Sequence, residues 1–160
     1  MNGDSLAGAW LAAANDAAIV VRLESIYQLI ADQIEARGPA CWASGRCCNF
    51  AKTGHRLYVT GLEAAYTIAR LPPSQRITEE TLGAAEARGD CPFLVSNLCG
   101  VHTIKPIGCR VYFCDRSAQE WQRLLSENAL AQIKALHDEF RIEYRYGEWR
   151  AMLRYFANES

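Results

Sequence analysis

Seven cysteines dominate the interpretation of this 160-residue chain, because they fall in two clusters in its middle part. The clusters comprise Cys41, Cys47 and Cys48, and then Cys91, Cys99, Cys109 and Cys114. An odd number excludes complete pairing into disulfides within one chain, and clustered cysteines in a reducing compartment are more often ligands or redox centres. Metal binding is therefore the first hypothesis, with buried inert thiols or disulfides as the alternative.

The start of the sequence predicts a cytoplasmic protein. Residues 1–8 contain neither Lys nor Arg, and the apolar stretch that follows is broken by Asn15 and Asp16. This pattern fits neither a signal peptide nor a membrane span. The 17 basic and 18 acidic side chains give a net charge of -1, which argues against a surface for nucleic acid or anionic lipid. We expect no nucleic-acid or membrane partner.

The length and the hydrophobic content of 50% suit one domain over residues 1–160, with a core that needs no disulfides. Apolar residues recur at helical spacing over about 4–37, and Gly38 with Pro39 ends the pattern. A second long helical pattern spans about 117–157. We expect Ser117 and Glu120 to form a capping box at its start and Gly147 to interrupt it.

Shorter elements are predicted between these two patterns. A strand is expected over 57–59, and Thr60 with Glu63 forms a capping box for a helix over about 61–71. Thr78 begins another short helix that ends before Gly89. The fold class is therefore mainly α: a small helical domain whose long N- and C-terminal helices pack together and frame cysteine-rich, metal-binding loops.

The number of thiolates bears on the kind of metal. Thiolates are soft ligands that suit iron, zinc and copper(I), and one tetrahedral or cluster site takes four of them. Seven exceed one such site, so the surplus would bridge metals, serve a second site or remain as thiols. Side chains of adjacent residues in an extended segment point to opposite faces, so there Cys47 and Cys48 either bind different metals or only one of them is a ligand. Both would bind a single ion only in a bent loop.

Several short motifs over residues 41–114 occur in the same order as in a known family. They are Cys41-Trp-Ala-Ser44-Gly45-Arg46-Cys47-Cys48, Cys91-Pro92-Phe93-Leu94, Cys99-Gly-Val-His102, Lys105-Pro106 and Cys109-Arg110-Val-Tyr. This arrangement resembles the YkgJ-type cysteine-cluster proteins, described as zinc- or iron-chelating domains of the CxxCxxCC type. The resemblance implies metal binding through Cys41, Cys47, Cys48, Cys91, Cys99 and Cys109.

One position departs from the family pattern. Ser44 stands where the second cysteine of the first motif would be, and a serine hydroxyl is a poor metal ligand at neutral pH. We expect Cys114 to supply the missing thiolate.

Other residues of the motifs have two interpretations each. His102 is either a metal ligand, a packing residue or a residue that hydrogen-bonds to a thiolate, and the last two are favoured over ligation. His55 is a weaker candidate for a ligand, and His137 is expected to be a structural histidine. Arg46 and Arg110 either offset thiolate charge or lie in solvent. Gly45 and Gly108 either permit close backbone approach or form ordinary turns.

The preferred function is a metal-binding protein with iron or an iron–sulfur cluster and a role in redox chemistry or metal handling. If it is an enzyme, an iron–sulfur oxidoreductase is the class expected, with an unidentified protein or redox partner. The alternative is a zinc-stabilised protein-interaction module without catalytic activity. A metal-free thiol–disulfide oxidoreductase is a third hypothesis, weakened by the absence of a CxxC step. No catalytic residue and no nucleotide-binding motif can be assigned.

Overall fold

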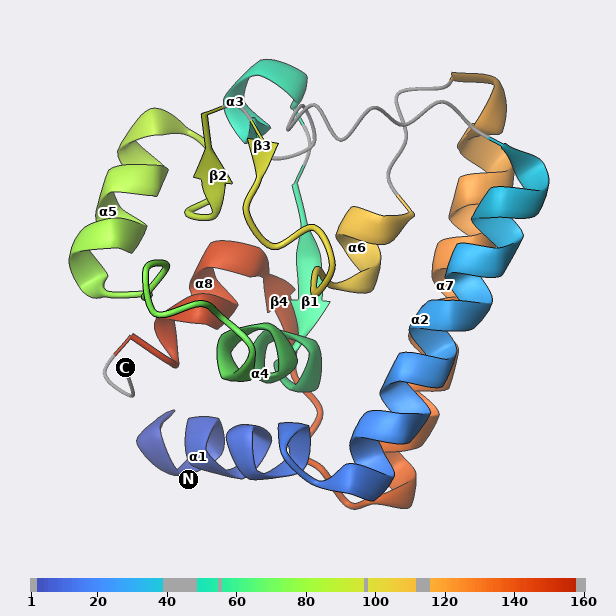
Figure 1. Cartoon of the computed structure of the whole chain (residues 1–160), viewed down its shortest axis with the longest axis horizontal. Coiled ribbons are helices and arrows are strands. Elements are labelled where there is room, and N and C mark those ends of the chain that lie inside the picture. Colours follow the sequence, from blue (N-terminus) through green and yellow to red (C-terminus); the bar gives the residue numbers. More distant parts are fainter. Residues whose placement is uncertain (1–2, 39–48, 55, 97, 112–115, 158–160) are drawn as a thin grey trace.

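The computed structural model describes residues 3–38, 49–54, 56–96, 98–111 and 116–157 (Figure 1). The helices are α1 (Gly3–Ala14), α2 (Ala17–Arg37), α3 (Phe50–Thr53), α4 (Gly61–Ala69), α5 (Glu79–Arg88), α6 (Ile107–Arg110), the 3₁₀ turn η2 (Arg116–Ala118), α7 (Gln119–Glu139) and α8 (Trp149–Arg154). The strands are β1 (Tyr58–Thr60), β2 (Leu94–Val95), β3 (Leu98–Cys99) and β4 (Tyr146–Glu148). The predicted mainly α fold class is confirmed.

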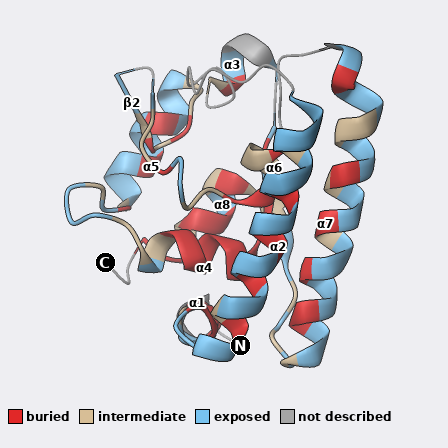
Figure 2. Ribbon diagram, turned by 45° about the vertical axis from the view of Figure 1, so that its right-hand side comes forward, coloured by how far each residue is buried: buried red, intermediate tan, exposed pale blue. Residues whose placement is uncertain are grey.

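The two longest helices, α2 and α7, pack side by side and run in opposite directions (Figure 1). Their buried side chains recur at helical spacing, and Figure 2 shows exposed residues along their outer faces. The buried residues are Leu23, Ile26 and Ile30 of α2 and Leu125, Ala129, Ile133 and Leu136 of α7. An ion pair of 2.9 Å between Arg22 and Glu139 joins one end of the pair. The predicted packing of the long N- and C-terminal helices is thus confirmed.

The prediction of one continuous helix over 4–37 is wrong. The helix breaks at Asn15 and Asp16, and α1 and α2 meet at a bend of 76°. Asp16 is the reason, because its Oδ1 accepts hydrogen bonds from the backbone N–H groups of Ala18 (2.9 Å) and Ile19 (3.3 Å) and so caps a new helix. Among the described residues no single helix has the length and hydropathy to cross a membrane, and α1 with α2 reaches them only across this bend.

The bend lets α1 pack against α4 at the centre of the molecule. Trp10 is fully buried there, and its indole N–H donates to the carbonyl of Glu143 over 2.9 Å. A Cβ on Gly61 would overlap the Trp10 ring, so only glycine allows this approach. Figure 2 shows α4 as a continuously buried helix, in which Gly61–Thr67 are all buried.

The helix boundaries test five local predictions. Thr60 and Glu63 form the expected capping box of α4, which ends at Ala69 rather than at 71. Thr78 caps α5, and Gly89 ends it with a φ of +75°. The capping box expected from Ser117 and Glu120 is wrong, since α7 begins after Ala118 without a side-chain cap.

The C-terminal pattern also divides differently. Helix α7 ends at Glu139, and the positive φ of 55° at Arg141 turns the chain away from the helix axis. Gly147 interrupts the pattern as expected, because it lies in β4 opposite Val59 of β1. The strand predicted over 57–59 is β1, one residue later. Strands β2 and β3 form a second antiparallel pair.

The elements next to the cysteine-rich segments gather at one end of the molecule. In Figure 1, α3, the β2–β3 hairpin, the C-terminal end of α2 and the N-terminal end of α7 all lie toward the upper edge. The chain therefore brings segments that are far apart in sequence to the same end of the helical frame.

Candidate metal centre

Three of the seven predicted ligands lie within the described residues. Cys91 is a buried, free thiol just before the β2–β3 hairpin, Cys99 ends β3, and Cys109 lies in α6. Cys99 and Cys109 are half-buried. The other predicted residues, Cys41, Ser44, Gly45, Arg46, Cys47, Cys48, His55 and Cys114, lie outside the described residues.

The sulfur of Cys91 accepts a hydrogen bond from a tryptophan. The indole Nε1–H of Trp149 points at its Sγ over 3.3 Å, and the Trp149 ring packs against Phe93 with centroids 5.8 Å apart. Trp149 is itself fixed by its backbone N–H, which donates to the carbonyl of Leu57 over 2.8 Å. Cys91 thus occupies an apolar site in which one N–H donor is aimed at sulfur.

Backbone hydrogen bonds tie Cys91 to Cys99 through the hairpin. The N–H of Leu94 donates to the carbonyl of Cys91 over 3.1 Å, and Leu94 pairs with Cys99 across the two strands. The N–H of Gly100 donates to the carbonyl of Phe93 over 2.8 Å. A Cβ on Gly100 would come within 2.7 Å of that carbonyl, so this glycine permits the close approach.

Cys109 is positioned by the buried carboxylate of Glu63. The N–H of Ile107, at the start of α6, donates to Glu63 Oε1 over 2.8 Å. Adjacent Gly108 lies against β1, and a Cβ there would overlap the Leu57 side chain and come within 3.2 Å of the Tyr58 carbonyl. The close backbone approach predicted for Gly108 is therefore confirmed.

Glu63 has several further partners. Its Oε2 accepts from the N–H of Thr60 (3.1 Å) and from the Thr60 hydroxyl (3.0 Å), and the Tyr27 hydroxyl approaches Oε1 at 3.4 Å. Burial raises the pKa of Glu63, and the hydrogen bonds from Ile107, Thr60 and Tyr27 oppose that rise. Burial and the nearby Glu63 charge also raise the pKa of Tyr27 well above its usual value. This carboxylate joins α2, α4 and α6.

Arg110 holds the loop before α6. Its guanidinium lies over the Tyr27 ring at 4.0 Å and donates to the carbonyls of Lys105 (2.7 Å) and Thr103 (3.1 Å). Arg110 is half-buried, so the alternative of full solvent exposure is wrong. The Arg110 side chain contacts the Tyr27 ring and these two carbonyls. That Arg110 also balances the charge of a thiolate stays a prediction.

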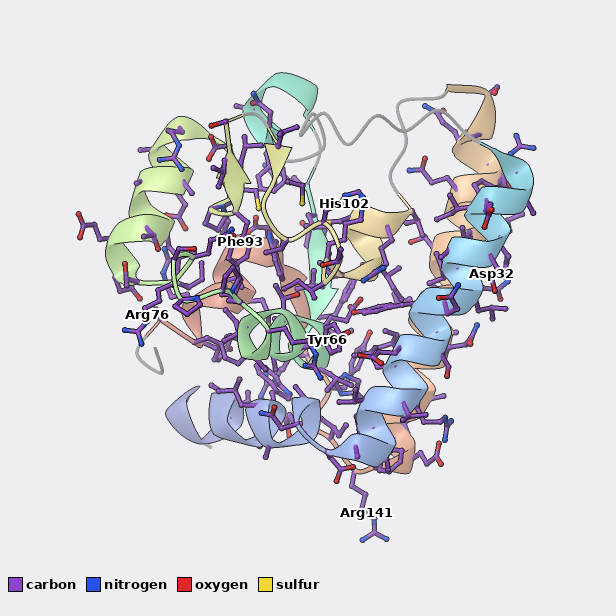
Figure 3. All side chains as sticks on the ribbon, viewed as in Figure 1. Asp32, Tyr66, Arg76, Phe93, His102 and Arg141 are labelled. Atoms are coloured by element: carbon purple, nitrogen blue, oxygen red, sulfur yellow. The ribbon has the colours of Figure 1, made fainter. Side chains whose placement is uncertain are left out.

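The two described histidines have different surroundings. His102 is exposed beside α6 (Figure 3), and its Nδ1 lies 3.2 Å from Lys105 Nζ. Partial burial and the charges of Lys105 and Arg110 lower the pKa of His102. His137 is fully buried, with Nδ1 3.3 Å from the Ile142 carbonyl, whereas its Nε2 has no hydrogen-bond partner among the described residues. The sequence predicts the structural role of His137, but not that one of its two ring nitrogens lacks a hydrogen-bond partner among the described residues.

A backbone hydrogen bond joins the segment just after the first cysteine cluster to the segment just before the second. The N–H of Ala51 in α3 donates to the carbonyl of Gly89 over 2.8 Å, and a Cβ on Gly89 would meet the Ala51 methyl. Phe50 is buried beside them, with the Arg150 guanidinium 5.0 Å from its ring centroid. In the sequence, Cys48 precedes Ala51 by three residues and Cys91 follows Gly89 by two.

Within 3–38, 49–54, 56–96, 98–111 and 116–157, no three His, Cys, Asp or Glu side chains are arranged to hold a metal ion. Four of the predicted thiolates lie outside these ranges, so the ligand set stays a prediction. The described part of the site contains cysteine sulfur atoms that are able to ligate a metal, and an indole N–H is directed at one of them. This arrangement fits the thiolate chemistry of iron or zinc.

Sequence reasoning missed the residues that position the cysteines. The sequence predicts Glu63 only as part of a helix cap and does not single out Trp149, so it links neither residue to a cysteine-bearing segment. Glu63 is the one acidic residue in the apolar sequence of α4, which could have indicated a buried carboxylate with several partners. No local sequence feature indicates the role of Trp149.

Comparison of the chain with protein-family models, with curated proteins and with solved structures finds no match, so its own residues carry the functional assignment.

Proposed function

We propose that this chain is a cysteine-cluster metalloprotein that binds iron, as an iron–sulfur cluster, with a role in redox chemistry or metal handling. The ligands would be drawn from Cys41, Cys47, Cys48, Cys91, Cys99, Cys109 and Cys114. The observation that carries the proposal is the 2.8 Å hydrogen bond from Ala51 to Gly89, because it joins the chain just after one cysteine cluster to the chain just before the other.

The surroundings of Cys91 support iron chemistry. Hydrogen bonds to sulfur and burial of the cluster are two of the means by which a protein adjusts an iron–sulfur potential. Cys91 has both, since Trp149 donates to its sulfur and its side chain is only 4% exposed. Cytoplasmic location and a resemblance to YkgJ-type proteins belong to the same proposal.

The alternative function is a zinc-stabilised interaction module. The observation that favours it is the tip of the β2–β3 hairpin, where Val95 is 51% and Leu98 is 58% exposed. Exposed apolar side chains beside a metal-bearing loop would give a protein partner a contact surface.

Metal analysis of freshly purified protein distinguishes these functions. Anaerobic purification is followed by visible absorption and by assays for iron, zinc and acid-labile sulfide. Iron with sulfide and broad visible bands would support the preferred function, and colourless protein with stoichiometric zinc would support the alternative. Metal-free protein with a reversible cysteine pair would overturn both.

Cysteine variants then test the ligands. Cys47→Ser and Cys109→Ser should each lower metal occupancy and solubility together, because structural metal affinity is coupled to folding. Ala131→Ser, on the exposed face of α7, is the matched control and should leave occupancy unchanged. Unchanged occupancy in both cysteine variants would remove them from the ligand set.

A further inference from the structure

A pocket of about 280 Å³ lies between α2 and the segment that joins Cys99 to Cys109. Of the cysteines that the structure describes, none lines this pocket, so it is separate from the sulfur atoms of Cys91, Cys99 and Cys109. One wall comes from α2 and is mainly apolar, with Tyr27, Ile30 and Ile34, and it also carries the carboxylate of Glu35. The opposite wall comes from residues 102–110 and carries His102, Lys105 and Arg110. The pocket is therefore divided into an apolar side and a cationic side.

Hydrogen-bond donors are concentrated on the cationic side. Lys105 Nζ lies 3.2 Å from His102 Nδ1, and because an ammonium group can only donate, Nδ1 is the acceptor and Nε2 carries the ring proton. Arg110 uses Nε and Nη2 for the carbonyls of Lys105 and Thr103, out of five N–H donors. Among the described residues, neither Lys105 nor Arg110 forms an ion pair with a carboxylate.

The cationic side is held in place before any ligand binds. The Tyr27 ring stacks under the Arg110 guanidinium at 4.0 Å, and the Thr67 hydroxyl donates to the Ile104 carbonyl over 2.7 Å. These contacts fix the segment from which Lys105 projects. A site whose donors are fixed at folding loses less conformational entropy when it binds.

The remaining lining residues limit the size and charge of the ligand. Tyr27 and Ile30 are almost completely buried and form a fixed apolar floor, so the more exposed Ala31 and Ile34 would provide most of the apolar surface that a ligand contacts. The small volume suits a compact body such as one aromatic ring. Glu35 adds one carboxylate to the lining, which disfavours anions of more than one charge.

We propose that this pocket binds a small organic monocarboxylate, with its carboxylate on Lys105, His102 and Arg110 and its apolar body on Tyr27, Ile30 and Ile34. The proposal does not depend on metal at the cysteines. The pocket would serve as a substrate or effector site next to the loop that carries Cys99 and Cys109.

Titration calorimetry at constant ionic strength tests the proposal with three probes. Sodium benzoate carries both a charge and an apolar body, benzamide keeps the body without the charge, and inorganic phosphate keeps the charge without the body. We expect saturable benzoate binding that is about tenfold tighter than that of either other probe, because a charge-assisted hydrogen bond and ring burial each contribute at this scale. Equal binding of benzamide or of phosphate would overturn the proposal.

Two variants, one that removes a charge and one that fills the pocket, test whether benzoate binds in this pocket. Lys105→Met keeps an unbranched side chain and removes the charge, and it should weaken benzoate about tenfold. Ala31→Phe fills the pocket from α2 and should abolish binding. Lys134→Met, which removes a cation from α7 outside the pocket, is the matched control.

Circular dichroism and metal content show whether each variant is folded, so a loss of metal is read separately from a loss of benzoate binding. Undiminished benzoate binding by folded Ala31→Phe, or by folded Lys105→Met, would overturn the assignment.

Discussion

The indole N–H of Trp149 donates a hydrogen bond to the sulfur of Cys91 over 3.3 Å, although the two residues are 58 positions apart in the sequence. The bond places a polar contact inside an otherwise apolar site. Trp149→Phe removes this donor and keeps an aromatic ring. We expect a loss of at least about 1 kcal/mol in the free energy of unfolding, measured with urea, because the hydrogen bond is lost and the smaller ring leaves a cavity at this buried position.

The same variant also tests the metal proposal. If iron–sulfur chemistry is present, loss of an N–H donor to sulfur should shift the reduction potential downward, because the bond stabilises the reduced, more negative cluster. Trp10→Phe is the control, since it removes an indole N–H that donates to the Glu143 carbonyl. A potential that moves equally in both variants would count against the role of Trp149.

Glu63 is predicted to be indispensable to the fold. Glu63→Ala leaves the buried N–H groups of Thr60 and Ile107 without their acceptor. We expect a loss of roughly 2–6 kcal/mol in the free energy of unfolding, because each of the two unsatisfied buried donors costs about 1–3 kcal/mol. Glu80→Ala, at an exposed position of α5, is the control. A loss no larger than that of the control would contradict this role.

Two glycines should respond in opposite directions to substitution by alanine. Gly61→Ala forces a methyl group into the Trp10 ring, and overpacking of this kind costs about 1–3 kcal/mol. Gly83→Ala lies in α5 with no atom within 4 Å of the new methyl group and should stabilise the protein by about 0.5–1 kcal/mol. Thermal unfolding measures both, and destabilisation of the same size in both would refute the Trp10 contact.

His137 should make stability depend on acid pH. Burial lowers the pKa of His137 below its ordinary 6.5, so the unfolded chain binds this proton more readily than the folded one. As pH falls below about 6.5, the free energy of unfolding should therefore fall, by at most about 1.4 kcal/mol per pH unit for one proton.

His137→Phe removes the titrating group and keeps a ring against Tyr144, whose centroid lies 5.2 Å away. Urea unfolding between pH 5 and pH 8 compares it with the parent protein. The two stability curves should run parallel above pH 7 and separate below it. Parallel curves over the whole range would contradict the prediction.

The elements that local sequence governs were predictable. The long pattern around Ile133 gave α7, and Thr60 and Thr78 marked the starts of α4 and α5, because apolar spacing and caps act over one or two helical turns. Asp16 escaped the same reasoning, since the apolar pattern continues on both sides of it while its carboxylate starts a new helix. A capping residue inside a stretch of helical periodicity favours the start of a new helix there, whereas the apolar spacing favours continuation of the old one.

The arrangement of the candidate site was less predictable, because it depends on contacts between distant residues. The cysteines themselves are visible in the sequence, but the neighbours of Cys91 and Cys109 come from α8 and α4. Glu63 was read only as a cap, and its second oxygen serves Ile107, 44 positions later. No periodicity or motif encodes such a pairing.

Helix α6 has only four residues, and a helix this short has little stability of its own. Its first amide is held by Glu63, and its last residue, Arg110, is clamped over Tyr27. Cys109, between them, is thereby confined by contacts on both sides of it in the chain. The position of the Cys109 sulfur is therefore fixed by the fold. An atom that binds this sulfur has to match that position in size and coordination, because the backbone of α6 does not adjust to it.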